Sequence, residues 1–474
     1  MLRTAVSRFA QLLRNSARAS NVRNARTSSG RKARLGLEQF EPREVLAAFT
    51  WTGAVSAVAS DPDNWSNNES DYRAPTDGDD VYFGAMSSGS HDCEGLHSDI
   101  AGFNSLTLAA GYDGTVTIAA DNFLNTGDFT LAGGAIAQPS ELITPIEING
   151  LFTWTGGVLN SNVYGGGVYI NGGGTITPPQ GGALTTGSTL VFGSSDGTEK
   201  TTAVDGQGTV LLAKTSDNAI FVNQNAKVVN QVRQVGSPQV WKCVDPAKGL
   251  LTLDVAGQWG YTGTGTIEDD LRVINQGGIF YLTGQATVEL TGGNATTPSY
   301  AQTSGSWLFK PSLRIMAGCV LDVSASKGAR ISGGDVQIYG NAALGLNAQT
   351  ATMKGTYEMT GGSIGFPSPL FVGTAFAWFT FKVDGDALWS GGDFATGIEG
   401  AVNMGQAHRW EVKGKLTVGA NAKIVATNVG GGQQVNGTWD VIACDTTADA
   451  TLPATNAGWT AVAIPNKKGF QAKK

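Results

Sequence analysis

One short phrase recurs along this chain: a few apolar or β-branched residues end in Thr or Ser, and Gly follows. It is clearest over Leu151–Thr177, where Phe152–Thr155, Val168–Ile170 and Thr175–Thr177 alternate with clusters of Gly, Asn and Ser. Each run is too short for a helix, so the pattern predicts strand, turn, strand. Related phrases occur at Phe49–Val55, Phe129–Ile136, Tyr357–Ile364 and Leu388–Phe394.

The composition agrees with many short strands joined by tight turns. Glycine makes up 66 of 474 residues, about twice the usual share. Charged residues (15%) are too few and apolar residues (41%) too many for a disordered chain, and glycine does not recur at every third position as in collagen. The spacing of the strand-sized runs indicates a repeated coil of roughly 20–25 residues, within the range of solenoid repeats.

We therefore predict an all-β fold, a parallel β-solenoid (β-helix), with a β-sandwich array as the alternative. Each coil buries its inward Val, Ile, Leu and Phe on the next coil, and Asn and Thr at the turn edges form stacked ladders. Trp154 is expected to pack between coils, with Gly156 and Gly157 at the corner. The open ends require caps, for which Trp51, Trp65 and the C-terminal segment are candidates. Coil handedness, and a choice between one solenoid and two segments, stay open.

Charge divides the chain. Residues 1–48 hold ten Lys and Arg and three acids, which leaves 22 basic and 36 acidic residues for 49–474. A body this acidic argues against nucleic-acid binding, which requires clustered Lys and Arg. We expect four regions: a basic export or anchoring segment (1–48), an N-terminal cap with the first coils (49–150), the solenoid body (151–430), and closing strands with a basic tail (431–474).

The N-terminal segment is read as an address. It is rich in Arg and Ser, contains no acid before Glu38 and lacks the apolar run of a secretory signal, so organelle targeting is one interpretation. Within it, Arg34–Ala47 (RLGLEQFEPREVLA) resembles the L-E-x-R-x-L-L type motif near the N-terminus of planctomycete extracellular proteins, with Phe40 and Val45 where leucine is commoner. This resemblance implies export to the cell surface or envelope. No stretch of the chain is apolar enough for a transmembrane helix.

A second resemblance covers residues 49–84, where W-T-G is followed by D-x-x-N-W, Pro and G-D-D-V-x-F. This order is similar to the opening block of autotransporter-like and planctomycete β-helical surface proteins, although the further Trp common before D-x-x-N-W is absent. The resemblance implies an exported β-helix. The residues that carry it are Trp51, Thr52, Gly53, Asp61, Asn64, Trp65, Pro75, Gly78, Asp79, Asp80, Val81 and Phe83.

Metal sites have two weak candidates. His91, Cys93 and His97 lie within seven residues and are the ligand types that bind a soft metal. Asp384 and Asp386 (VDGDAL) form a possible calcium turn. Against both stands the ordinary interpretation of a solvated turn or a buried thiol, so we expect no cofactor, with calcium as the possible exception. The four cysteines, Cys93, Cys243, Cys319 and Cys444, show no C-x-x-C spacing, which favours buried free thiols over a zinc site but leaves long-range disulfides open.

Catalytic sets are hard to find in this sequence. Three histidines make a Ser-His-Asp arrangement improbable. Carboxylates that a β-helical lyase or hydrolase would need occur at Asp77/Asp79/Asp80, at Glu268/Asp269/Asp270 with Arg272, and at Asp384/Asp386. Tryptophans that would bind glycans if exposed, and that otherwise belong to the core or caps, are Trp154, Trp241, Trp259, Trp307, Trp378 and Trp389.

The prediction from sequence is thus an exported, extracellular or envelope β-solenoid with a structural or adhesive role and no enzymatic activity. Its partners would be polysaccharide or other envelope components. Two alternatives are kept: a carbohydrate-active β-helix (a polysaccharide lyase or hydrolase) or a glycan-binding protein, and an organelle-targeted protein. The sequence leaves open the ligand, the oligomeric state and any cleavage of the N-terminal segment.

Overall fold

A computed structural model describes most of the chain after residue 46. The described residues are 47–68, 72–98, 102–119, 123–138, 145–159, 167–213, 218–232, 240–243, 251–293, 297–303, 311–316, 319–324, 328–339, 349–365, 371–372, 375–376, 378–398, 407–428, 437–447, 452–464 and 469–474. The basic segment and nearly all of the export-type motif lie outside them. All described residues belong to one compact unit, Leu46–Lys474.

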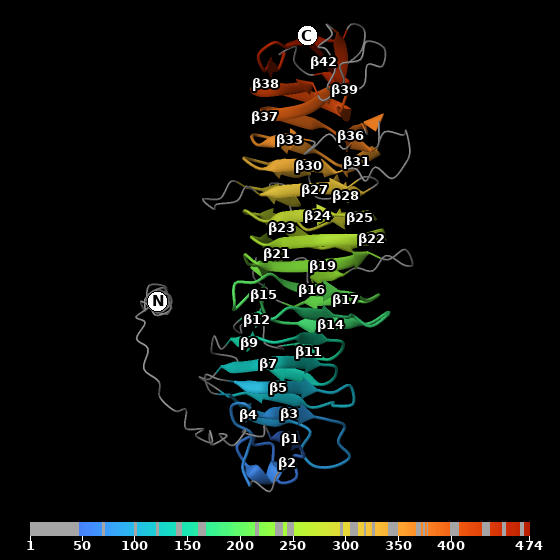
Figure 1. The fold of residues 1–474 in the computed structure, drawn as a ribbon. Helices are drawn as coiled ribbons and strands as arrows, with labels where there is room; N and C mark the ends of the chain where they lie inside the picture. Colours follow the sequence, from blue (N-terminus) through green and yellow to red (C-terminus); the bar gives the residue numbers. More distant parts are fainter. Residues whose placement is uncertain are drawn as a thin grey trace, which may run out of the picture. The chain divides into compact units, whose positions relative to one another are not determined.

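That unit is the predicted all-β parallel solenoid (Figure 1). Within the described residues, regular structure consists of strands and one short 3-10 turn at Pro62–Asn64. Parallel pairing continues from the first strand, β1 (Ala48–Trp51), to β39 (Thr438–Thr447). The described part of the chain contains no helix long and apolar enough to cross a membrane.

The strands stack in three columns. The first column, called here the front column, contains β3 (Asp80–Phe83), β5 (Phe103–Leu108), β7 (Leu124–Leu131), β10 (Phe152–Trp154), β13 (Gly174–Ile176), β16 (Lys200–Val204), β19 (Ala226–Val232), β22 (Gln258–Asp269), β24 (Ile279–Leu282), β27 (Ser312–Met316), β30 (Asp335–Tyr339), β33 (Ser363–Gly365), β37 (Ala387–Ile398) and β38 (Arg409–Asn428).

The other two columns complete each coil. The second runs through β9 (Ile146–Ile148), β12 (Val168–Ile170), β15 (Leu190–Phe192), β18 (Asn218–Val222), β21 (Leu251–Val255), β23 (Leu271–Asn275), β26 (Tyr300–Gln302), β29 (Ala329–Ile331) and β32 (Tyr357–Met359). The third begins as a seven-stranded sheet of β4 (Cys93–Leu96), β6 (Thr115–Ile118), β8 (Ala135–Ala137), β11 (Val158–Leu159), β14 (Ala183–Thr186), β17 (Thr209–Leu212) and β20 (Trp241–Cys243). It continues along the second half of β22, β25 (Gln285–Leu290), β28 (Val320–Asp322), β31 (Gln349–Lys354) and β36 (Phe379–Asp384).

Coil length is regular only at first. Leu108, Leu131 and Trp154 are register partners 23 residues apart, as the sequence predicts. Later partners, such as Ile364 and Phe394, are 30 residues apart. The expected 20–25 residues is therefore too short for the later coils, because the connections between strands lengthen while the strands still stack in register.

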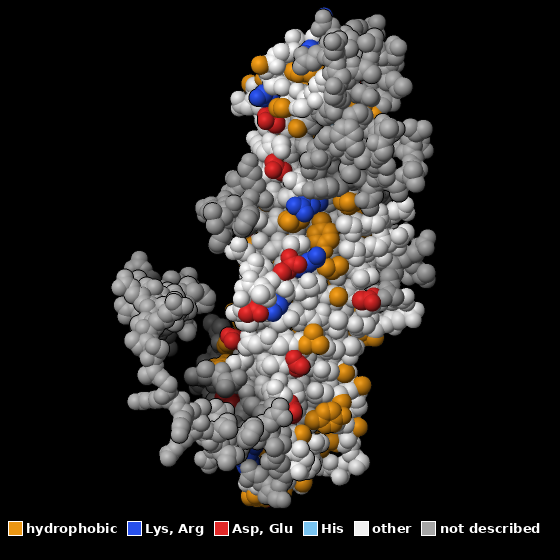
Figure 2. Space-filling view, in the orientation of Figure 1, with side chains coloured by type: hydrophobic (Ala, Val, Ile, Leu, Met, Phe, Trp, Pro, Cys, Tyr) orange, Lys and Arg blue, Asp and Glu red, His pale blue; other side chains and the backbone are white. Residues whose placement is uncertain are grey.

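The outward face of the front column changes along its length. Thr107, Thr130, Thr153 and Thr175 are consecutive register partners in the early coils. From β19 onward the same outward row holds dissimilar side chains. Figure 2 shows acidic and basic side chains interleaved along the middle of this face, over the coils from β16 to β27. The predicted ladders occur at a turn edge, where Asn149 donates to Asn125 (2.8 Å) and Asn171 donates to Asn149 (3.1 Å).

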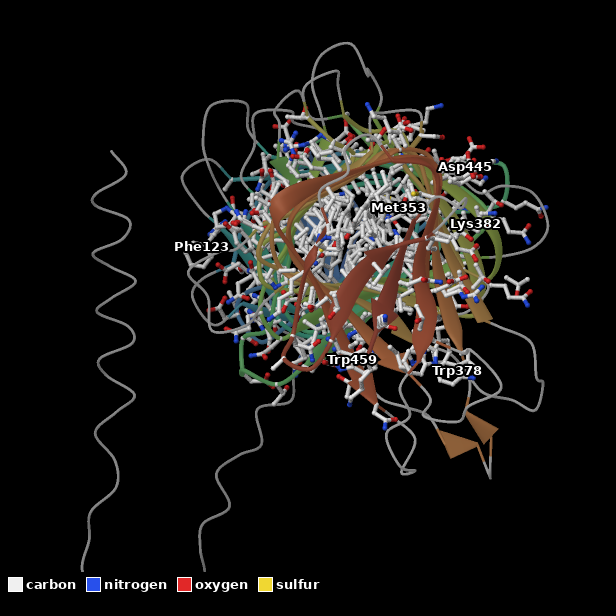
Figure 3. All side chains as sticks on the ribbon, turned by 90° about the horizontal axis from the view of Figure 1, so that it is seen from above. Phe123, Met353, Trp378, Lys382, Asp445 and Trp459 are labelled. Carbon is white, nitrogen blue, oxygen red and sulfur yellow. The ribbon has the colours of Figure 1, made fainter. Side chains whose placement is uncertain are left out.

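The interior of the stack is one continuous apolar core. Figure 3 shows Met353 inside the ring of strands, and Lys382 and Asp445 at its outer edge. Trp154 is fully buried between its register partners Leu131 and Ile176, as predicted. Full burial of one large apolar side chain contributes about 1.5–3 kcal/mol, so a core repeated coil after coil stabilises the long stack.

Antiparallel strands close both ends. β2 (Trp65–Asn67) pairs antiparallel with β1, and the rings of Trp51 and Trp65 meet edge to face with centroids 4.9 Å apart. At the other end β42 (Gly469–Lys473) pairs antiparallel with β39 and with β41 (Thr460–Ala463). The predicted caps are thus confirmed. By covering the last parallel strands, they remove edges that would otherwise pair with other chains.

Candidate functional site

The soft-ligand cluster on β4 is not brought together. Cys93 is fully buried in the core, and burial raises the pKa of its thiol. His91 lies outside and pairs with Asp113 (Nδ1 to Oδ1, 2.6 Å), while exposed His97 faces its own backbone at the Gly95 carbonyl (3.3 Å). A strand alternates its side chains between two faces, so Cys93 cannot share a metal with its exposed neighbours. Among the described residues, no group of three His, Cys, Asp or Glu side chains is placed to hold a metal.

Asp384 and Asp386 are engaged by the coil that follows them. Asp384 forms an ion pair with Lys413 (2.8 Å), and this lysine lowers the pKa of the carboxyl. Asp386 accepts a hydrogen bond from the backbone N–H of Lys415 (2.8 Å). The two carboxylates join β36 and its turn to β38, which is a structural use, and the calcium site expected from the sequence gains no support from this geometry.

The remaining carboxylate groups are divided in the same way. Asp79 is buried and accepts from Arg73 (2.9 Å) and from the Thr76 backbone N–H (2.8 Å). Asp269 is buried inside the coil, whereas its neighbour Asp270 accepts from Thr291 at the surface. Each carboxylate therefore belongs to a separate contact, and the sequence neighbours do not form an acid–base pair.

Most of the tryptophans considered as glycan platforms are part of the core. Trp154, Trp241, Trp259 and Trp389 are fully buried, so an exposed role for them is wrong. Trp378 is half-buried and its ring lies against His408, with centroids 5.2 Å apart. Trp307 lies outside the described residues. Of the cysteines, Cys319 and Cys444, like Cys93, are buried free thiols, as predicted.

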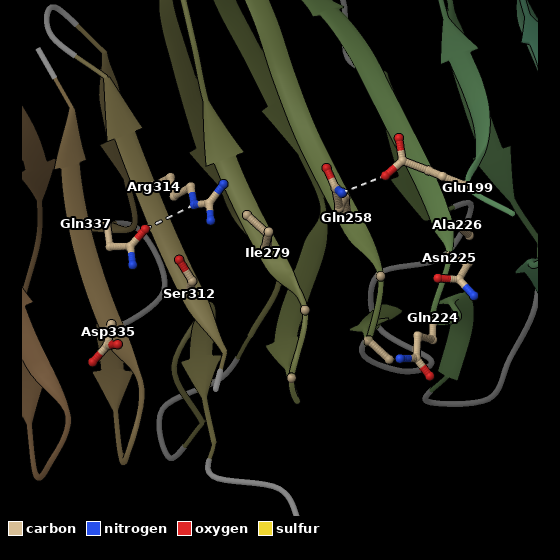
Figure 4. Close-up of a pocket in the computed structure, with 14 residues that line it drawn as sticks. Glu199, Gln224, Asn225, Ala226, Gln258, Ile279, Ser312, Arg314, Asp335 and Gln337 are labelled. Carbon is tan, nitrogen blue, oxygen red and sulfur yellow. Dashed lines mark hydrogen bonds between the residues drawn. The ribbon is translucent and has the colours of Figure 1, made fainter. Parts of the chain in front are cut away.

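A polar groove that the sequence did not indicate crosses the front column. Its volume is about 330 Å³, and one coil after another contributes to it, from the turn before β16 to β30. The floor includes glycine corners on consecutive coils, where a Cβ at Gly257 or Gly278 would lie 2.3 Å from a backbone carbonyl oxygen. The polar and apolar side chains along its walls are Glu199, Gln224, Asn225, Gln258, Ile279, Ser312, Arg314, Asp335 and Gln337 (Figure 4).

Several of these side chains are held by one another. Gln258 Nε2 donates to Glu199 Oε2 (2.9 Å), and Arg314 Nε donates to Gln337 Oε1 (3.1 Å), the two contacts drawn in Figure 4. Asp335 accepts from the Ser363 hydroxyl (2.7 Å). These contacts fix the carboxylate, amide and guanidinium groups before any ligand arrives, which reduces the entropy lost on binding.

Comparisons with protein-family models, with curated proteins and with solved structures return no match for this chain. The groove is therefore interpreted from its chemistry alone. It presents donors and acceptors on a rigid sheet face, a pattern that binds a polar ligand.

Sequence reasoning missed the groove for a physical reason. Its residues come from coils of unequal length, so no fixed spacing links Gln258 to Ser312 or Asp335 although they occupy one outward row. The only available signal is that outward positions in β22–β30 carry large polar groups, where the earlier coils carry Thr.

Proposed function

We propose that this chain is an exported cell-surface or envelope protein, a β-solenoid with a structural or adhesive role and no chemistry of its own. The export part of the proposal is supported by the L-E-x-R-like motif at Arg34–Ala47 and by the block of residues 49–84. The role is supported by the form of the folded unit, a long stack that is capped at both ends.

One observation carries the structural role: the side chains that suggested chemistry are used to hold coils together. Asp384 and Asp386 bind the coil after theirs, and Asp269 bonds to backbone and side chain of neighbouring strands. A protein whose ionisable groups connect one coil to the next is suited to resist extension or to present a surface.

Cell fractionation of the source organism with an antibody against residues 49–474 tests the localisation. We expect the protein in the envelope or the medium, and expect a chain that lacks residues 1–48 to stay inside the cell. Recovery of the full chain in the cytosol would reject the proposal, and recovery in an organelle would favour targeting by the basic segment.

The second candidate, a polysaccharide lyase or hydrolase, is tested by product release. Purified protein is incubated with neutral and acidic polysaccharides, and reducing ends and unsaturated products are measured. We expect neither product. Sustained release that depends on a carboxylate of the chain would replace the non-enzymatic proposal.

A further inference from the structure

We infer that the groove on the front column binds an uncharged polyhydroxylated carbohydrate along the axis of the stack. The inference rests on the adhesive part of the proposed function and adds to it a site and a ligand class. The lining is a row of planar hydrogen-bonding groups on successive strands, with an apolar centre at Ile279. A volume of about 330 Å³ is at the lower end of the range typical of ligand sites.

The chemistry of the row fits sugar hydroxyls. A hydroxyl group both donates and accepts, whereas a carboxylate only accepts, a guanidinium only donates and an amide does both. Glu199, Gln258, Arg314 and Gln337 together supply all of these types. Ile279 lies between the polar groups and offers an apolar surface to the C–H face of a sugar ring.

An unused polar atom lies in the same groove. The Ser312 hydroxyl oxygen is buried and has no hydrogen-bond partner among the described residues. A buried hydroxyl without a partner costs about 1–3 kcal/mol, so its retention within a wall that faces a possible ligand is meaningful. A ligand hydroxyl at this position would supply the missing partner.

The charges select against an anionic ligand. The lining carries two carboxylates, Glu199 and Asp335, and one guanidinium, Arg314. An acidic polysaccharide would bring further negative charge beside both carboxylates, on a body that is itself acidic. An uncharged sugar has no such penalty and uses the carboxylates as acceptors.

The same spacing argues for binding without cleavage. Gln258, Ile279, Ser312 and Asp335 are successive register partners, so three strand spacings separate the first from the last, about 14 Å. Gln258 bonds to Glu199 at the other end of the row (Figure 4). The two carboxylates thus lie beyond the roughly 5–10 Å that either glycosidase mechanism requires.

The test uses the purified full chain and affinity electrophoresis in gels that contain β-glucan, xylan, galactomannan or polygalacturonate, followed by calorimetry with oligosaccharides of any neutral polymer that retards it. We expect retardation by at least one neutral polymer and none by polygalacturonate. Arg314→Ala and Gln258→Ala should each weaken binding at least tenfold. Thr153→Ala, which changes an outward residue of β10 in an early coil of the same column, should leave it unchanged.

Ser312→Ala separates a binding role from a structural one. Loss of an unpartnered hydroxyl should leave the melting temperature equal or higher, while binding of the neutral oligosaccharide falls severalfold. The inference is overturned if the wild-type chain binds no neutral polymer, if it binds only polygalacturonate, or if all three groove variants bind like the wild type. A surface protein that fails these tests would keep the proposed function without this site, and a cytosolic protein that passes them would keep the site without the proposed function.

Discussion

Asp269 provides the sharpest test of how this stack is held together. Its carboxylate is fully buried where the seven-stranded sheet ends, and it accepts hydrogen bonds from the Trp241 backbone N–H (3.0 Å) and from the Tyr261 hydroxyl. Burial in the core raises the pKa of Asp269 to about 7, against an ordinary value of 3.8. Asp269→Asn keeps the shape and the hydrogen bonds but removes the titration.

The direction of the pH effect follows from these two values. Between pH 3.8 and about 7 the folded chain holds the Asp269 proton more tightly than the unfolded chain does. The free energy of unfolding therefore decreases as the pH rises through this window and is constant outside it. At about 1.4 kcal/mol per pH unit, the full loss is on the order of 4 kcal/mol by pH 8.

The comparison with Asp269→Asn is needed because His408 acts in the opposite direction. Burial lowers the His408 pKa to about 4 from 6.5, so its contribution to the free energy of unfolding increases with pH between these values. The two effects partly cancel in the wild-type chain. The variant retains the His408 effect alone, so the difference between wild type and variant isolates Asp269.

Denaturant unfolding followed by tryptophan fluorescence at pH 4, 5, 6, 7 and 8 measures this difference. Hydrogen exchange of peptides from β22 adds a local readout, because long repeat arrays need not unfold in one step. We expect Asn to equal or lower stability at pH 4 and to raise it by up to about 4 kcal/mol at pH 8. A difference that does not change with pH would refute the assignment of a raised pKa to Asp269.

Three further predictions concern single positions. Gly157→Ala should destabilise by roughly 1–3 kcal/mol more than Gly181→Ala, because both have left-handed φ but only Gly157 would place its Cβ within 2.6 Å of a carbonyl oxygen; equal melting temperatures would contradict this. Trp154→Phe should cost under about 1.5 kcal/mol, since the indole N–H has no partner among described residues, whereas Trp154→Ala should cost about 3–5 kcal/mol. In urea titrations, His408→Gln should lose less stability than wild type between pH 6.5 and 4.

The fold was predictable because its signals are local. Short runs interrupted by glycine leave no room for helices, and the corner predicted at Gly156 and Gly157 is present: Gly157 has φ +70°, and the space beside both glycines is filled by the backbone of the preceding coil. The terminal caps were predictable as well, because Trp51 and Trp65 stand outside the regular pattern. In each case a residue type has a single physical use at that place.

The orientation of single side chains was only partly predictable. Alternation in a strand places Cys93 inside, but Gly95, with φ +77°, shifts the register between Glu94 and Leu96 and turns Leu96 inward as well. His97 is left outside the strand. A cluster that is compact in sequence is thereby separated in space, and neither the spacing of its residues nor their chemistry reveals the shift.

The groove could not be predicted because it depends on register between coils of unequal length. Along one outward row the early coils repeat Thr, a residue that suits a half-buried strand and needs no partner beyond its neighbours. The stack does not require anything else at these positions, as four consecutive threonines demonstrate. Where the same row changes to dissimilar polar residues, the change is not explained by folding, and a ligand is the simplest reason for it. The register that carries this argument runs Thr107, Thr130, Thr153, Thr175, Ala203, Val229, Gly260, Tyr281, Arg314 and Gln337.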